Sequence, residues 1–142
     1  MVINMGNNDL RNLSEAMAEM LDDVNFYYHL TGKENGNSIN ENGLLMEVNK
    51  LSSTTIPLDD SFYEDPEHFV DFEVGSPQTR SKDIMVIVGC DDGQEQFLIR
   101  ENDEGEYFIP SENILGYVNI DEKEFYANMN SMYEIESMGY GR

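Results

Sequence analysis

The sequence predicts an α+β fold in which an antiparallel sheet of about four to six strands packs against an N-terminal and a C-terminal helix. Three observations predict this class. Apolar residues in 8–30 recur every three or four positions, as on one face of a helix. Short apolar runs separated by turn residues fill 83–120, which is typical of a β-meander. Asp121 and Glu124 form a capping box ahead of a second helical pattern.

The N-terminal helix is expected over 8–30. Its apolar positions are Leu10, Leu13, Met17, Met20, Leu21, Val24 and Tyr28. Asn8 or Asp9 can cap its start, and Thr31-Gly32 can end it. We interpret the methionines on this face as core residues, because a flexible side chain fills irregular gaps against a sheet.

Residues 33–80 are expected to form a loop and edge strands. Lys33–Gly43 is rich in Gly and Asn, which favour turns. The expected strands are Leu44–Val48, Leu51–Leu58 and Phe69–Val74. Acidic residues alternate with aromatic ones in Asp59–Glu73, and Pro66 breaks that segment in the middle. A turn should follow at Gly75–Pro77.

The β-meander is expected over 83–120. Ile84–Val88 is a continuous apolar run that predicts a buried strand, and Asp91-Asp92-Gly93 predicts a turn after it. The other expected strands are Gln96–Arg100 as hairpin partner of the first, Tyr107–Ile109, and Ile114–Ile120. A second turn is expected at Asn102–Gly105, and Pro110-Ser111 interrupts the last two strands.

The C-terminal helix is expected over 121–136, with Phe125, Met129 and Met132 on one face. The tail that follows, Ser137–Arg142, is expected to fray. Because the chain shows no internal repeat and no hinge, we predict that residues 1–142 form a single domain.

The formal net charge of −21 on 142 residues is the strongest functional signal, with 29 acidic residues against eight Lys and Arg. With 39% hydrophobic residues the chain can still form a core, so we expect a folded protein. Direct binding to nucleic acid is not expected, because phosphate contacts need basic clusters. Arg80 with Lys82 is the one local basic pair. The absence of a long apolar segment and of a signal peptide predicts a cytoplasmic protein without membrane contact.

Sequence motifs for catalysis are lacking, so we expect a protein that is not an enzyme. His29 and His68 are the only histidines, and neither stands in a catalytic signature. Cys90 precedes two aspartates whose charge should raise its pKa, which makes it a poor nucleophile. We find no nucleotide-binding motif and no metal-ligand spacing, and we therefore predict no cofactor and no metal.

The surplus of carboxylates suggests a mimic of nucleic-acid charge. Duplex DNA has about one negative charge per 1.7 Å, so this net charge corresponds to roughly 35 Å of duplex. A surface of that density can occupy a basic groove and form charge-assisted contacts with its arginines. The sequence therefore predicts a basic nucleic-acid-binding protein as partner. An ordinary acidic cytosolic protein remains an open alternative.

One stretch of the second half resembles a known family. The residues are Gln96-Phe97-Leu98-Ile99-Arg100, Asn102-Asp103, Gly105-Glu106-Tyr107, Ile109, Ser111-Glu112-Asn113, Asp121-Glu122, Glu124-Phe125-Tyr126 and Met129. They are similar to the small acidic phage anti-CRISPR proteins that inhibit type II CRISPR nucleases. The resemblance covers about a third of the chain. It implies a three-stranded antiparallel sheet with helices that displays carboxylates in place of the DNA motif read by the nuclease.

The resemblance nominates seven partner-facing carboxylates: Asp103, Glu104, Glu106, Glu112, Asp121, Glu122 and Glu124. To these we add Asp91 and Asp92 from the first turn, and Tyr107 and Tyr126 as aromatic anchors. The helix over 8–30 and the acidic aromatic segment have no counterpart in that family.

Our leading hypothesis is a phage-encoded, non-enzymatic inhibitor in the host cytoplasm that occludes the basic cleft of a CRISPR or restriction nuclease. One alternative is an immunity protein that neutralises a basic nuclease toxin. Another is a small enzyme or ligand-binding protein with a pocket near His68 and Cys90. The sequence leaves both a monomer and a homo-oligomer open.

Overall fold

A computed structural model describes residues 10–51, 54–74 and 83–133. It confirms the α+β class: the chain forms a five-stranded antiparallel sheet, a three-stranded antiparallel sheet and several helices. The predicted turn at Gly75–Pro77, the predicted frayed tail and the outer ends of both predicted terminal helices lie outside the described residues.

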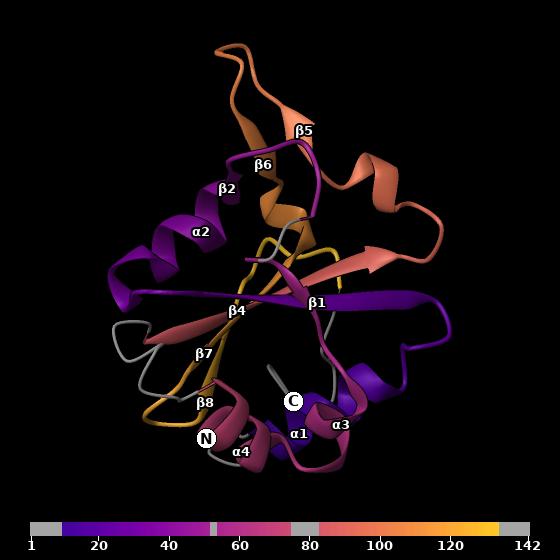
Figure 1. The fold of residues 1–142 in the computed structure, drawn as a ribbon, viewed down its shortest axis with the longest axis vertical. Helices are drawn as coiled ribbons and strands as arrows, with labels where there is room; N and C mark the ends of the chain where they lie inside the picture. The colour runs from indigo at the N-terminus through magenta and orange to yellow at the C-terminus, as the bar shows by residue number, and fades with distance from the viewer. Residues whose placement is uncertain (1–9, 52–53, 75–82, 134–142) are drawn as a thin grey trace.

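The five-stranded sheet has the order β3-β1-β4-β7-β8 (Figure 1). Its strands are β1 (Val24–Thr31), β3 (Ile56–Pro57), β4 (Ile84–Asp91), β7 (Ile114–Asn119) and β8 (Glu124–Ala127). β4 is central, and every residue from Ile84 to Cys90 is buried, as the continuous apolar run predicts. Such a run is typical of a strand that is covered on both faces.

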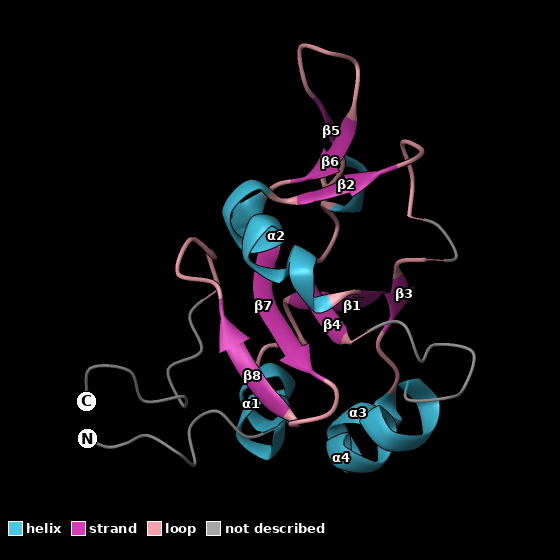
Figure 2. Ribbon diagram, turned by 90° about the vertical axis from the view of Figure 1, so that its left-hand side faces the viewer, coloured by secondary structure: helices cyan, strands magenta, loops and turns pink. Residues whose placement is uncertain are grey.

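Helices cover one face of this sheet. They are α1 (Leu10–Ala18), α3 (Asp60–Glu64) and α4 (Pro66–His68), and a π-helical turn, Phe69–Val74, follows α4. Figure 2 shows all three helices at the same end of the molecule. Leu13 of α1 and Phe62 of α3 pack there against Met85 and Ile87 of β4. This confirms a helix near the N-terminus that packs on the sheet.

A second layer covers the opposite face. The three-stranded sheet has the order β2-β6-β5 and lies beside α2 (Gly36–Asn42). Its strands are β2 (Leu44–Met46), β5 (Arg100–Glu101) and β6 (Tyr107–Ile109). Ile39 and Ile109 pack against Val86 and Val88, the β4 residues that alternate with those of the first core. Short 3₁₀ turns connect these elements at Lys33–Asn35, Glu95–Phe97 and Ser111–Asn113.

The prediction of one helix over 8–30 is wrong beyond Ala18, because the second half of that segment is strand β1. Val24 and the aromatic run that follows it have high strand propensity, and they pair with the full length of β4. The apolar spacing of the sequence fits both a helix and a half-buried strand over so few residues.

Two expectations for 33–74 are also wrong. Lys33–Gly43 is not a loop, because it contains α2, and Ile39 of this helix is buried in the second core. Gly43, with a φ of 94°, follows the last helical residue, Asn42. Phe69–Val74 is not a strand. Phe69 and Val70 are consecutive and both buried, which a strand with one covered face does not allow. The Phe69 ring packs edge-on against the Phe62 ring, with the ring centroids 5.6 Å apart.

The predicted strands Tyr107–Ile109 and Ile114–Ile120 are confirmed, and so is a strand at the start of Leu44–Val48 and at the end of Leu51–Leu58. The predicted β-meander over 83–120 is wrong. Both edges of β4 are occupied by β1 and β7, so Gln96–Arg100 has no edge of β4 to pair with. Leu98 is buried in the second core instead, and β5 pairs with β6.

The predicted C-terminal helix is wrong for its described residues. Residues 124–127 form β8, which pairs with β7. Phe125 is buried while Tyr126 is exposed, which is the alternation of a strand. Met129 is 85% exposed, so the helical spacing of the apolar residues does not correspond to a buried face. Asn119 rather than Asp121 supplies the side-chain cap of the connecting turn, accepting a hydrogen bond from the Glu122 N–H at 2.9 Å.

Candidate binding surfaces

The predicted partner-facing carboxylates lie in separate places. Asp91 ends β4, whereas the Ile120 N–H donates to the Asp83 carbonyl at 2.9 Å and so places Asp121 beside the start of β4. Eight strand residues separate the two ends by about 24 Å. Figures 1 and 2 show the β5–β6 turn, which contains Asp103 and Glu104, at the far end of the molecule from α1, α3 and α4.

One group of carboxylates comes from α3, α4, the segment after α4 and the β7–β8 turn, and we call it the acidic end. Its members are Asp59, Asp60, Glu64, Asp65, Glu67, Asp71, Asp121, Glu122 and Glu124. All are exposed except Glu124, which is half-buried. Three of the predicted site residues therefore belong to this group, and six of its members were not nominated from the sequence.

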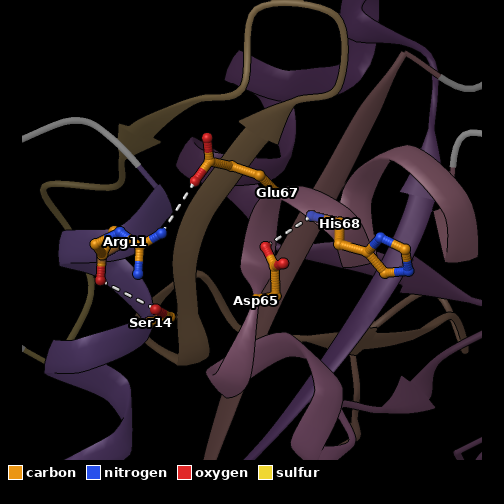
Figure 3. A network of polar contacts seen from close by, with 5 residues as sticks. All are labelled: Arg11, Ser14, Asp65, Glu67 and His68. Carbon is orange, nitrogen blue, oxygen red and sulfur yellow. Dashed lines mark hydrogen bonds and ion pairs between the residues drawn. The ribbon is translucent and has the colours of Figure 1, made fainter.

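Two ion pairs assemble the acidic end. Lys123 Nζ lies 2.7 Å from Asp71 Oδ1, which joins the β7–β8 turn to the segment after α4. Arg11 of α1 lies 3.6 Å from Glu67 Oε1 of α4 (Figure 3). Both pairs are solvent-exposed, so each contributes at most about 1 kcal/mol to stability. Their role here is to place carboxylates from separate segments side by side.

Local sequence fixes the two helices of this surface. The Asp59 side chain accepts a hydrogen bond from the Ser61 N–H at 2.9 Å and caps α3. Asp65 accepts from the His68 N–H at 3.2 Å and caps α4, which has Pro66 at its first position (Figure 3). Aspartate at an N-cap and proline next to it are the residues that start helices most readily. Two of the nine carboxylates, Asp59 and Asp65, therefore have a structural role as helix caps.

Tyr126 borders the acidic end on β8. Its ring stacks on that of Tyr117 with centroids 5.3 Å apart, and its hydroxyl donates to Glu122 Oε1 at 2.6 Å. That hydrogen bond is the main cause that raises the pKa of Tyr126 to about 12, with smaller contributions from burial and the charges of Glu122 and Glu124. The Tyr126 side chain thus orients a carboxylate and remains 40% exposed.

A second group lies on the β5–β6 turn, which we call the acidic hairpin: Glu101, Asp103, Glu104 and Glu106. The Asn102 side-chain oxygen accepts from the N–H groups of Glu104 and Glu106 at 2.9 and 3.0 Å. This confirms the predicted turn at Asn102–Gly105. Tyr107, the other proposed anchor, is half-buried in β6 at the base of the hairpin.

The remaining predicted carboxylates are engaged within the molecule. Tyr133 donates to Asp91 at 3.0 Å, and Asn25 donates to Asp92 at 3.1 Å. Glu112 lies 3.4 Å from Arg100 in an exposed ion pair. A partner's arginine would have to compete with these contacts, as it would at five carboxylates of the acidic end: Asp59, Asp65, Glu67, Asp71 and Glu122.

The two residues named for the alternative pocket lie on opposite faces of the five-stranded sheet. His68 is exposed on α4, whereas Cys90 is buried in β4. Burial is the largest cause that raises the Cys90 pKa to about 11, followed by the charges of Glu95 and Asp91. The direction of the shift confirms the prediction, although burial contributes more than the adjacent aspartates. A thiol with this pKa is almost entirely protonated at neutral pH.

A cavity of about 640 Å³ lies elsewhere, and the sequence did not indicate it. Its lining residues are His29, Thr31, Asn35, Ser38, Ile39, Asn42, Gly43, Leu44, Leu45, Asn102 and Phe108. They come from β1, α2, β2 and the β5–β6 pair. Because these segments are separated in the sequence and come together only in the folded chain, no local sequence pattern can reveal the cavity.

In the parts of the chain that the structure describes, no helix has the length and apolar character to span a membrane. Over the same ranges, His, Cys, Asp and Glu side chains do not form a group of three suited to a metal ion. Comparison with protein families, with curated proteins and with solved structures finds no match to this chain.

Proposed function

We propose that the protein is a non-enzymatic inhibitor that occludes the basic nucleic-acid-binding cleft of another protein, with the acidic end as its contact surface. The observation that supports this most is the Lys123–Asp71 pair, which joins the β7–β8 turn to the helical segment that directly follows α3 and α4. It places nine carboxylates against two basic side chains, Arg11 and Lys123, among the described residues of that surface.

The exposure of these carboxylates suits a partner that supplies arginines. An exposed carboxylate keeps its hydration until it binds, and a guanidinium can then replace that water with two parallel hydrogen bonds. Tyr126, stacked on Tyr117 at the border, offers a rigid aromatic contact beside the charges. A net charge of −21 accelerates the encounter with a basic groove and makes it sensitive to salt.

The first target to test is a guide-loaded type II CRISPR nuclease, the class that the resemblance implies. The wild-type protein should reduce binding of duplex target DNA by this nuclease in a stoichiometric manner, and added duplex should compete with it. Raising the salt from 50 to 200 mM should weaken the complex by about tenfold or more, as for a contact made largely of charges.

A variant with four substitutions, Asp60→Asn, Glu64→Gln, Asp121→Asn and Glu122→Gln, tests the surface. It spares the caps and both ion pairs, so it should fold as the wild type does. Exposed ion pairs contribute up to about 1 kcal/mol each, and the variant should bind at least tenfold more weakly. Tight binding of the wild type to a basic nuclease toxin, with none to the CRISPR nuclease, would instead favour the immunity protein.

A further inference from the structure

The cavity between α2, the end of β1 and the edge of the three-stranded sheet has the size of a small-molecule site. Its volume of about 640 Å³ lies within the range of roughly 300–1,000 Å³ that is typical of ligand pockets. β2 is an edge strand of its sheet, and its residues Leu44 and Leu45 line this space. The cavity is separate from the acidic end and does not depend on the function proposed for that surface.

The lining of this cavity contrasts with the rest of the chain because it has no Asp, Glu, Lys or Arg. An anion would meet the repulsion of a molecule with net charge −21, and the lining has no Lys or Arg to offset it. A cation would find no carboxylate there to offset the loss of its hydration. The lining therefore selects for an uncharged ligand.

Polar groups in the wall are held in place by hydrogen bonds with one another. The Asn35 amide donates to Thr31 Oγ1 at 2.9 Å, and the Asn42 amide donates to Ser38 Oγ at 3.4 Å. His29 Nδ1 lies 2.7 Å from the Thr54 carbonyl, which can only accept, so Nδ1 donates and the ring orientation is fixed. An asparagine amide has two donors and an acceptor, so each can also bind the mixed donor and acceptor edge of a ligand.

An apolar wall completes the cavity. Leu45 of β2 and Phe108 of β6 stand directly opposite each other in the register, so their side chains lie on the same face of the sheet. Leu45 is 66% exposed, so its side chain is accessible to a ligand in this cavity. The aromatic face of Phe108 next to it can stack on a flat ring, as bases do on aromatic side chains.

We infer that this cavity binds an uncharged nucleoside. The base stacks on Phe108 beside Leu45, its polar edge meets the amides of Asn35 and Asn42, and the ribose hydroxyls meet the remaining polar wall. The same chemistry disfavours the corresponding nucleotide, because a 5′-phosphate brings negative charge into an acidic molecule whose cavity lining has no Lys or Arg.

Calorimetric titration with adenosine and uridine, and with their 5′-monophosphates, tests this. At least one nucleoside should bind saturably, and its monophosphate should bind at least tenfold more weakly at low salt. The blocking variant is Ser38→Tyr, which fills the cavity from α2. Asn37→Tyr adds the same side chain at an exposed position of α2 outside the lining and is the matched control. Ser38→Tyr should weaken nucleoside binding at least about tenfold, the value of a lost stacking contact. Asn37→Tyr should leave the affinity unchanged.

Nuclear magnetic resonance of the wild-type protein keeps the proposal testable if Ser38→Tyr fails to fold. The nucleoside should shift the amide signals of Gly43, Leu45 and Phe108 and leave those of Asp60 and Asp121 unchanged. Absence of saturable binding by both nucleosides would overturn the inference. Equal affinity for the monophosphate, or shifts confined to other parts of the molecule, would overturn it as well.

Discussion

Cys90 illustrates what single residues in this chain can be predicted to do. The sequence identified it as a poor nucleophile from the aspartates that follow, and burial in β4 adds the larger cause. Side chains that depend on distant partners could not be assigned in this way. Glu122 orients toward Tyr126, and Asp71 pairs with Lys123, through contacts that only the β7–β8 turn and the helical segment create.

The raised Cys90 pKa predicts a loss of stability in alkali. The folded protein holds the thiol proton up to about pH 11, whereas the unfolded chain releases it near the ordinary value of 9.0. The stabilising contribution is complete below pH 9 and is lost as the pH rises toward 11. Chemical denaturation of the wild type between pH 8 and 10.5 should show this decline.

Cys90→Val is the control for that experiment, because it keeps an apolar side chain of similar size without a titrating group. Its free energy of unfolding should fall less steeply between pH 9 and 10.5. The tyrosines with raised pKa values, Tyr27, Tyr63, Tyr126 and Tyr133, are present in both proteins, and the charge of Cys90 is a minor cause at Tyr27 and Tyr133. An identical slope in the two proteins would contradict the assignment to Cys90.

At the scale of elements, prediction succeeded where burial alone decides the structure. Ile84–Val88 is apolar throughout and became the central strand, while Asn102–Gly105 has turn chemistry and became a turn. It failed where the same spacing fits two structures. The segments before and after the sheet, Val24–Thr31 and Glu124–Ala127, are strands because β4 and β7 offer them free edges. That is a property of the assembled sheet.

The pairing of β7 with β8 makes Gly116 indispensable. Its φ is 147°, and a Cβ at this position would lie 2.2 Å from the Tyr126 carbonyl oxygen and 2.8 Å from the Phe125 ring. Gly116→Ala should therefore lower the free energy of unfolding by about 2–4 kcal/mol, through backbone strain and overpacking together. Urea denaturation at neutral pH measures this.

Gly93→Ala is the matched control, since Gly93 also has a positive φ, 86°, but its Cβ would meet nothing within 4 Å. That substitution should cost only about 1 kcal/mol, the strain of the left-handed conformation. Equal losses for the two glycines would show that the approach of β8 to β7 does not constrain position 116.

At the scale of the whole molecule, the surplus of charge was evident from composition, but its arrangement was not. The sequence nominated carboxylates from 91 to 124 as one set, and the fold separates them among the strand end, the acidic hairpin and the acidic end. The density of acids in Asp59–Glu67 was visible in the sequence. Their relation to Asp121 and Glu122 was not, because it depends on the packing of α4 against α1 and on the Lys123–Asp71 pair.

Self-repulsion of so many exposed carboxylates predicts that salt stabilises the fold. Screening should raise the free energy of unfolding on the order of 1 kcal/mol between low salt and 0.5 M sodium chloride. The ion pairs among described residues contribute little to stability, so their screening by salt costs little free energy. The acidic-end variant should gain less from salt than the wild type does. A fall in stability with salt would mean that attractive pairs outweigh repulsion.

The measurement that tests the account most directly compares two variants with equal charge. The first is the acidic-end variant with Asp60, Glu64, Asp121 and Glu122 neutralised. The second neutralises the four carboxylates of the acidic hairpin by Glu101→Gln, Asp103→Asn, Glu104→Gln and Glu106→Gln. The measurement is the Kd of each variant for the same basic nuclease. We expect the acidic-end variant to bind at least tenfold more weakly than the wild type. The hairpin variant should bind within about threefold of the wild type. Equal weakening in both would contradict the account, because total charge rather than one assembled surface would then govern binding.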